Sequence, residues 1–281
     1  MAKKVSEPEY ILSRLNTKML NYKVYVMSAK EKMLYFLLAF VAGGVIGLTF
    51  YGGLFRDSDG YATAATSISN LIVFVVAGLI AAKIFIPMRT KQLQEKRLQE
   101  LTMQFRSLLE TLAVSLSSGM NMAESLQGAL EDLRQQYSHE AYIVKEVSEM
   151  ISGMQNNIPI EETMGFLGER SNIDDIKNFS VVFSVAYRAG GNLKDIVRRT
   201  NSIISEKIEI SGEIETALSS NKTQFTAMMV IPVIMVLLLK SMSSDFAAGF
   251  SSIVGVVAIT IAIGIFVLAY KLGQKIMDVK G

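Results

Sequence analysis

Four long apolar stretches free of charged residues divide the chain into two hydrophobic hairpins around one charged block. They cover residues 33–55, 61–82, 223–239 and 246–270, and the second reaches 86 once Lys83 is allowed to extend its amine to the lipid headgroups. An α-helix rises 1.5 Å per residue, so about 20 apolar residues cross a ~30 Å hydrocarbon layer. The pattern predicts four transmembrane helices at 33–55, 61–86, 223–239 and 246–270.

Within the block 89–222, apolar residues recur at steps of three and four, which is typical of amphipathic helices. The first stripe is Leu98, Leu101, Phe105, Leu108, Leu112 and Leu116. Further stripes predict helices near 122–136, 143–151, 160–167 and 173–186, with Asn121 and Glu124 at the start of the first of these. A buried strand is an alternative for 179–186, but the helical spacing continues from Ile173. The predicted fold is an all-α membrane protein with an antiparallel helical bundle between two transmembrane hairpins.

The last apolar stripe of the block continues towards the third span. It begins at Leu193 and Ile196, and no proline follows before Pro232. The pattern therefore predicts one helix that runs from the bundle into the span. Such a helix would transmit motion of the bundle directly to the membrane.

Glycines at Gly119, Gly190 and Gly191 separate the predicted helices, and each break is followed at once by a new apolar stripe. Glycine suits a helix end because it adopts positive φ without steric cost. Asn157, before Pro159, is an imperfect third copy. If Gly191 adopts positive φ, replacing it with valine costs on the order of 1 kcal/mol or more.

The composition agrees with a membrane protein, because 50% of the residues are hydrophobic and only 19% are charged. The net charge of +2 is unevenly distributed along the chain. Block 89–222 has 15 basic and 19 acidic residues, and this slight negative charge argues against nucleic-acid binding. The basic excess lies in the short flanks, as Lys3, Lys4, Arg14, Lys18, Lys23, Lys30, Lys32, Arg89, Lys91, Lys96, Arg97, Lys271, Lys275 and Lys280. The positive-inside rule then places the tails 1–32 and 271–281 and the block in the cytoplasm, and the short loops 56–60 and 240–245 outside.

The sequence offers little chemistry of its own. It contains no cysteine, which excludes disulfides and thiolate metal sites. It lacks a phosphate-binding glycine loop, a His-Glu-x-x-His motif and a serine-elbow motif. We therefore expect no catalytic, cofactor or metal site, and no enzyme activity. One group of basic residues flanks the Gly190-Gly191 break and is either a solvated surface or a docking face for a partner: Arg188, Lys194, Arg198 and Arg199.

Two motifs resemble a known family. Ser118-Gly119-Met120-Asn121-Met122 followed by Leu126, and Ala189-Gly190-Gly191-Asn192-Leu193 followed by Ile196, are similar to two stretches of the type II secretion system F domain. The resemblance covers roughly 101–239. One such domain between two hairpins resembles the platform proteins of Tad (tight adherence, Flp pilus) systems, of the TadB or TadC type. The chain departs from the family at Asn157, where a glycine usually precedes the proline.

The resemblance implies a non-enzymatic platform in the bacterial inner membrane. Its partners would be a cytoplasmic hexameric secretion ATPase, pilin subunits and a second platform protein or another copy of itself. A different class shares the four-span layout, namely the stator subunits of ion-driven motors. Such a stator needs a partner subunit that bears a membrane carboxylate, and it relies on prolines in its later spans. Here Pro232 is present, but span 246–270 contains no proline and neither late span contains an acid. A transporter is also disfavoured, because the spans have almost no polar residues to line a path.

Overall fold

The computed structural model describes residues 7–55, 63–242 and 244–277. These residues form two compact units. Unit 1 contains the described residues up to Val26 and Thr90–Ile210, and unit 2 contains Met27–Arg89 and the described residues from Ser211 onwards. The elements are β1 (Tyr10–Leu12), β2 (Lys18–Leu20), α1 (Ala29–Tyr51), α2 (Ala64–Ser117), α3 (Met122–Gln136), α4 (Tyr142–Gln155), α5 (Ile160–Ser171), α6 (Asp174–Arg188), α7 (Leu193–Met242), α8 (Ser244–Ser251) and α9 (Ile253–Met277).

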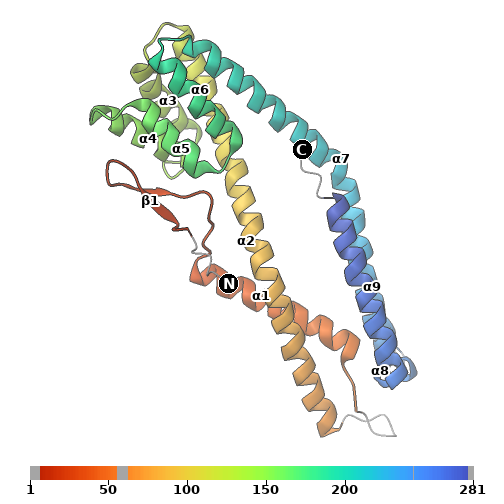
Figure 1. Cartoon of the computed structure of the whole chain (residues 1–281). Helices are drawn as coiled ribbons and strands as arrows, with labels where there is room; N and C mark the ends of the chain where they lie inside the picture. The colour runs from red at the N-terminus through yellow and green to blue at the C-terminus, as the bar shows by residue number, and fades with distance from the viewer. Residues whose placement is uncertain (1–6, 56–62, 243, 278–281) are drawn as a thin grey trace. The chain divides into compact units, whose positions relative to one another are not determined.

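Unit 1 is a helical bundle around one apolar core. Figure 1 shows α3 to α6 gathered around the C-terminal end of α2. The predicted stripes supply the core, because each places one apolar face inward. Its fully buried side chains include Leu101, Phe105, Leu108 and Leu112 of α2, Leu126 of α3, Ile143 of α4, Ile160 of α5 and Phe183 of α6. The rings of Phe105 and Phe179 meet edge to face at 5.5 Å, which joins α2 to α6.

Local signals explain where the bundle helices begin and end. Asn121 and Glu124 form a complete capping box at the start of α3, as their spacing predicts. Asn172 ends α5 in the left-handed conformation, with φ of 56°. The segment 179–186 lies within helix α6, so the strand alternative is wrong there. Its buried residues follow the helical period and place Ile176, Phe179 and Phe183 on one face.

The N-terminal segment contains structure that the sequence patterns did not indicate. Strands β1 and β2 form an antiparallel hairpin in which Tyr10 pairs with Leu20. Its turn contains Asn16 with φ of 60°, and the amide of Ser13 donates to the carbonyl of Thr17 at 2.9 Å. Each strand has three residues, which is too short to show an alternating pattern. The hairpin belongs to unit 1, whereas the sequence predicted only a polar tail over 1–32.

Unit 2 holds the four helical segments that are long and apolar enough to cross a membrane. They lie in α1, α2, α7 and α9, which confirms an all-α, multi-pass membrane protein. In the first hairpin, a Cβ added at Gly43 would overlap Ala81, and one at Gly47 would overlap Ala77. These glycines therefore let α1 and α2 approach closely, as small residues do in membrane helices.

Two helices extend from one unit into the other. Helix α7 is uninterrupted from Leu193 to Met242, which confirms the prediction of a single helix that enters the third span. Helix α2 is also continuous and contains Pro87, so the predicted block limits 89 and 222 both fall inside helices. The predicted loop 56–60, span residues 61 and 62, loop residue 243, tail residues 278–281 and the flank residues Lys3 and Lys4 lie outside the described residues.

Candidate functional site

Two helix breaks in unit 1 share one conformation. Gly119 follows α2 with φ of 85°, and Gly190 follows α6 with φ of 67°. An asparagine then accepts a backbone hydrogen bond from an acidic residue three positions later: Asn121 from Glu124 at 2.9 Å, and Asn192 from Asp195 at 3.4 Å. A left-handed glycine followed by a capping asparagine closes one helix and opens the next within a few residues. The recurrence seen in the sequence is therefore a repeated turn.

The left-handed glycine of the second turn is Gly190. Gly191 has no positive φ. The predicted cost of replacing it with valine assumed a positive φ there, so that cost does not apply. A Cβ at Gly191 would come within 3.3–3.5 Å of atoms of Ala186, a contact that small shifts can relieve. A Cβ at Gly190 would meet nothing within 4 Å, but it would still experience the strain of positive φ. The hypothesis from the sequence attached the positive φ to Gly191, whereas its neighbour Gly190 adopts it.

The third break uses asparagine in place of glycine. Asn157 has φ of 57°, which is the left-handed conformation. Asparagine is among the few other residues that visit this region, because its short polar side chain can hydrogen-bond locally. Pro159 then precedes α5 and its carbonyl accepts from the amide of Glu162 at 3.0 Å. The departure at Asn157 therefore keeps the geometry that a glycine would give.

The basic residues predicted as a docking face lie around the second turn. Arg188 ends α6, and its Nε donates to Oε1 of Glu161 at 3.1 Å. Lys194, Arg198 and Arg199 lie in the first turns of α7, with both arginines exposed. Nη2 of Arg198 donates to Oγ of Ser117 at 3.4 Å. This contact brings the start of α7 next to the end of α2, so the first and second turns lie at the same end of the bundle.

Residues 108–239 match the family model of type II secretion system protein F. The match contains all three turns, α3 to α6 and most of α7. Residues 108–239 therefore form a domain of the type II secretion system F family. Proteins of this family generally work within secretion or pilus machinery, together with an ATPase and other platform proteins. No curated protein and no solved structure matches the chain significantly.

A buried ion pair, which sequence reasoning missed, lies inside the F domain. Arg170 of α5 donates to Glu146 of α4 through two bonds, Nη1 to Oε1 at 3.1 Å and Nη2 to Oε2 at 2.6 Å. The two side chains are only 2% and 3% exposed. The guanidinium also lies 4.2 Å from the ring centroid of Phe166. Each group offsets part of the cost of burying the other, whereas removing one of them leaves an uncompensated buried charge, which is strongly destabilising.

The N-terminal segment completes this cluster from outside the matched range. Oη of Tyr22 donates to Oε1 of Glu146 at 2.9 Å, and Nη1 of Arg170 donates to the carbonyl of Leu20 at 2.6 Å. The amide of Tyr22 also donates to the carbonyl of Arg170 at 3.1 Å. Burial, assisted by the negative charge of Glu146, raises the pKa of Tyr22 far above its usual value. Tyr22 is therefore a neutral hydrogen-bond donor at physiological pH.

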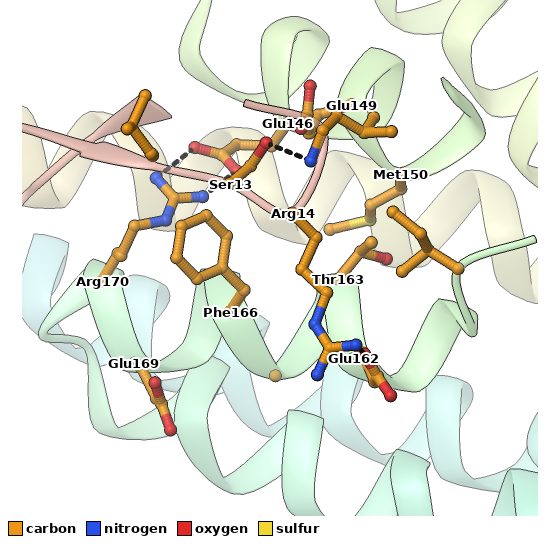
Figure 2. A pocket seen from close by; sticks show the side chains of 14 residues that line it. Ser13, Arg14, Glu146, Glu149, Met150, Glu162, Thr163, Phe166, Glu169 and Arg170 are labelled. Atoms are coloured by element: carbon orange, nitrogen blue, oxygen red, sulfur yellow. Dashed lines mark hydrogen bonds and ion pairs between the residues drawn. The ribbon is translucent and has the colours of Figure 1, made fainter. Parts of the chain in front are cut away.

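A pocket of about 450 Å³ adjoins the cluster, between the hairpin loop and helices α4 and α5. Figure 2 shows Arg170 pointing towards Glu146, the Phe166 ring beside it, and Glu169 directed away. The charged groups are largely paired: Arg14 contacts Glu162 at 2.9 Å, and Thr17 donates to Glu149 at 2.6 Å. Among the described residues, no group of His, Cys, Asp or Glu could hold a metal ion. The buried cluster and the two contacts at the rim of the pocket attach the hairpin to the F domain.

A sequence signal for the buried pair existed. Glu146 stands three residues after Ile143 and four before Met150, both of which belong to the inward stripe of α4. Arg170 stands three residues after Leu167, on the buried face of α5. Opposite charges at inward positions of two adjacent helices indicate an internal ion pair. No comparable pattern marks Tyr22, whose burial depends on contacts far along the chain.

Proposed function

We propose that the chain is an inner-membrane platform protein of a Tad- or Flp-like type IV pilus, or of a type II secretion-like machine. In this role it couples a cytoplasmic ATPase to the insertion of pilin subunits into a filament. The observation that carries the proposal is the F-family match over 108–239 in a chain with four candidate membrane spans. The family supports the general class, and the hairpin–domain–hairpin order favours the Tad type.

The chain would act without enzyme activity of its own. Its sequence has no phosphate-binding loop, so the energy for assembly would come from a partner. The continuous helix α7 supports a mechanical role, because a force applied near Leu193 has an unbroken backbone along which to act. Under this proposal both termini and the F domain are cytoplasmic, where an ATPase can reach them.

The basic residues Arg188, Lys194, Arg198 and Arg199 are the docking face that we propose for the ATPase. Arg198 and Arg199 support this assignment because they are exposed at the end of the bundle where two turns meet. Exposed positive charges increase association rates with acidic surfaces and fix the orientation of the partner.

The first test is genetic and biochemical. Deletion of the gene in a piliated host should abolish filament assembly, and the tagged full-length chain should co-purify with the hexameric ATPase. Normal filaments in the deletion strain would refute the proposal. Ion conductance by the reconstituted chain would instead favour a stator.

The second test concerns the docking face. Reversing both charges, as Arg198→Glu with Arg199→Glu, should reduce ATPase co-purification and filament number. The matched control reverses two exposed cations elsewhere in the domain, Arg134→Glu with Lys145→Glu. If the first pair of changes leaves both readouts at the level of the control, these arginines are only a solvated surface.

A further inference from the structure

The pocket beside the buried cluster is formed by three segments of unit 1. Helix α4 contributes Met150, helix α5 contributes Phe166, and the end of β1 with the loop after it contributes Leu12 and Leu15. These side chains give the pocket an apolar lining, and its volume of about 450 Å³ lies within the range of ligand pockets. The pocket can therefore receive a side chain of a second molecule.

Helix α5 has a glycine at the pocket that helix packing does not require. Glycine weakens the interior of a helix, so it usually has a structural reason there. Gly168 of the same helix has such a reason, because an added Cβ would lie 2.5 Å from Oγ of Ser180 on α6. A Cβ added at Gly165 would meet nothing within 4 Å, and Gly165 lines the pocket. A larger side chain at this position would reduce the space that the pocket offers.

The charges of the lining make the pocket negative. Four glutamates and two arginines line it, and each arginine is paired with one of the glutamates. The other two, Glu149 and Glu169, form no ion pair within the part of the chain that the structure describes. Glu169 is directed away from the pocket in Figure 2, whereas Oε1 of Glu149 accepts from the hydroxyl of Thr17 at 2.6 Å. The pocket therefore favours a cation, with Glu149 as its main acceptor.

Strand β1 ends at the pocket and has an unpaired edge. In an antiparallel pair, the backbone groups of alternate residues point away from the neighbouring strand. The amide of Asn21 donates to the carbonyl of Glu9 within the hairpin, so the backbone groups of Tyr10 and Leu12 point outward. These groups have no hydrogen-bond partner among the described residues, and both side chains are exposed. Such an edge is a template for one more strand.

We propose that this surface binds an extended segment of a protein partner, which pairs with the edge of β1 and places an arginine in the pocket. In strand addition, backbone hydrogen bonds supply affinity and side-chain pockets supply specificity. Arginine suits the pocket because its planar guanidinium binds carboxylates and packs on aromatic rings. The chain's own Arg14 already binds in this way at the rim, with Nη1 at 2.9 Å from Oε2 of Glu162.

The site has a consequence for the N-terminal hairpin. A bound segment contacts the hairpin loop and helices α4 and α5 together, so it holds the hairpin more firmly on the F domain. The site uses none of the basic residues of the proposed ATPase face, and it does not depend on the pilus role.

Binding of a defined peptide to the full-length chain in phosphatidylcholine nanodiscs tests the proposal. The probe is a fluorescent peptide of alternating arginine and threonine, and its counterpart has glutamate in place of arginine. Fluorescence anisotropy should show binding of the arginine peptide, weakened by added salt because salt screens exposed charges. The glutamate peptide should not bind. Absence of binding, or equal binding of both peptides, would overturn the proposal, as would equally tight binding of free arginine amide.

Variants of the lining locate the bound peptide. Gly165→Leu fills the pocket and should abolish binding. Its control is Gly128→Leu on α3, outside the pocket, where an added Cβ also meets nothing within 4 Å. Glu149→Gln removes the charge, keeps an acceptor for Thr17 and should weaken binding about tenfold. Binding that survives Gly165→Leu, or that Gly128→Leu weakens equally, would show that the peptide binds elsewhere.

A change to the peptide backbone tests the strand pairing. Methylation of the backbone amides of the arginine peptide removes its donors and should weaken binding, while its charge stays the same. Binding of the unmodified peptide should also slow hydrogen exchange at the amides of Tyr10 and Leu12. Equal affinity of the methylated peptide, or unchanged exchange in β1, would overturn the pairing. Unchanged exchange of α4 and α5 in the peptide-free variants shows that each remains folded.

Discussion

The two units place the same kinds of side chain in opposite ways, and helix α2 contains both arrangements. In unit 1, Leu108 of α2 is completely buried among other bundle helices. In unit 2, Leu71 of the same helix is 65% exposed. Many apolar residues of α1, α7 and α9 are exposed as well. Unit 1 thus provides its own apolar interior, whereas unit 2 requires lipid to cover its surface. Helical periodicity alone does not distinguish these cases; the width of the apolar surface does.

The units also accommodate charge differently. Unit 1 places the pair Arg170–Glu146 inside the bundle, where each charge neutralises the other. In unit 2, Nζ of Lys240 donates to the carbonyls of Thr49 and Gly52 at 2.9 and 3.1 Å. Those carbonyls lie at the C-terminal end of α1, where unsatisfied acceptors and the helix dipole favour a cation. Unit 1 thus buries a charged side chain together with its counter-ion, whereas unit 2 holds a lysine amine at the C-terminal end of a helix.

The largest expected effect comes from breaking the buried pair. Glu146→Ala leaves Arg170 buried without its counter-ion and should lower the stability of unit 1 by about 3–5 kcal/mol. Hydrogen exchange of α4 and α5 in the full-length protein measures the loss. Glu140→Ala is the control, because the Glu140–Lys145 pair is exposed and its loss should leave exchange unchanged. The double variant Glu146→Met with Arg170→Met should be less damaging than Glu146→Ala, and equal damage would contradict this account.

The second prediction places one charge in each environment of α2. Ile72→Lys puts a charge on the apolar surface of the span and should oppose insertion by about 2.5–3.5 kcal/mol. Val114→Lys, at an exposed position of the same helix in unit 1, should have almost no effect. The fraction of protein that resists alkaline extraction from membranes measures both. Equal recovery of the two variants would show that the two halves of α2 face similar surroundings.

The third prediction concerns the attachment of the N-terminal hairpin. Tyr22→Phe removes a hydrogen bond to a charged acceptor, so the hairpin should lose about 1.5–3 kcal/mol of local stability. Because the folded-state pKa of Tyr22 is raised, its contribution is complete below pH 10 and declines as the pH rises further, when the unfolded form ionises. Hydrogen exchange of β1 and β2 at increasing pH measures this decline. Tyr22→Phe should reduce the decline, and an identical pH profile in both proteins would exclude Tyr22 as its source.

The smallest expected effect separates the two glycines of the second turn. Gly190→Ala places a side chain at positive φ and should lower stability by about 1–2 kcal/mol. Gly191→Ala has only the contact with Ala186 to relieve and should cost less. Thermal unfolding of the two detergent-solubilised variants compares them directly. A lower melting temperature for Gly191→Ala than for Gly190→Ala would contradict the assignment of the strained position.

Local patterns predicted the parts of the F domain that depend on neighbours in sequence. The capping box at Asn121, the breaks at Gly119 and Gly190 and the entry of one helix from Leu193 into the third span all follow from residues near one another in sequence. The hairpin near Tyr10 was missed because its strands have three residues each and gain their stability from α4 and α5. Its attachment through Tyr22 joins residues that are far apart in the chain, which no local period reveals.

The sequence alone determined the number of spans, the helical class of the bundle and the positions of its turns. Periodicity, helix caps and the length of apolar stretches are determined by residues close together in sequence, so they can be recognised from the sequence alone. Only the tertiary structure decided that Gly190 carries the positive φ, that Glu146 and Arg170 neutralise each other, and that a pocket lies beside this pair between the hairpin loop and helices α4 and α5. The ion pair and the pocket depend on which surfaces meet in space, because burial and charge pairing are properties of packed neighbours.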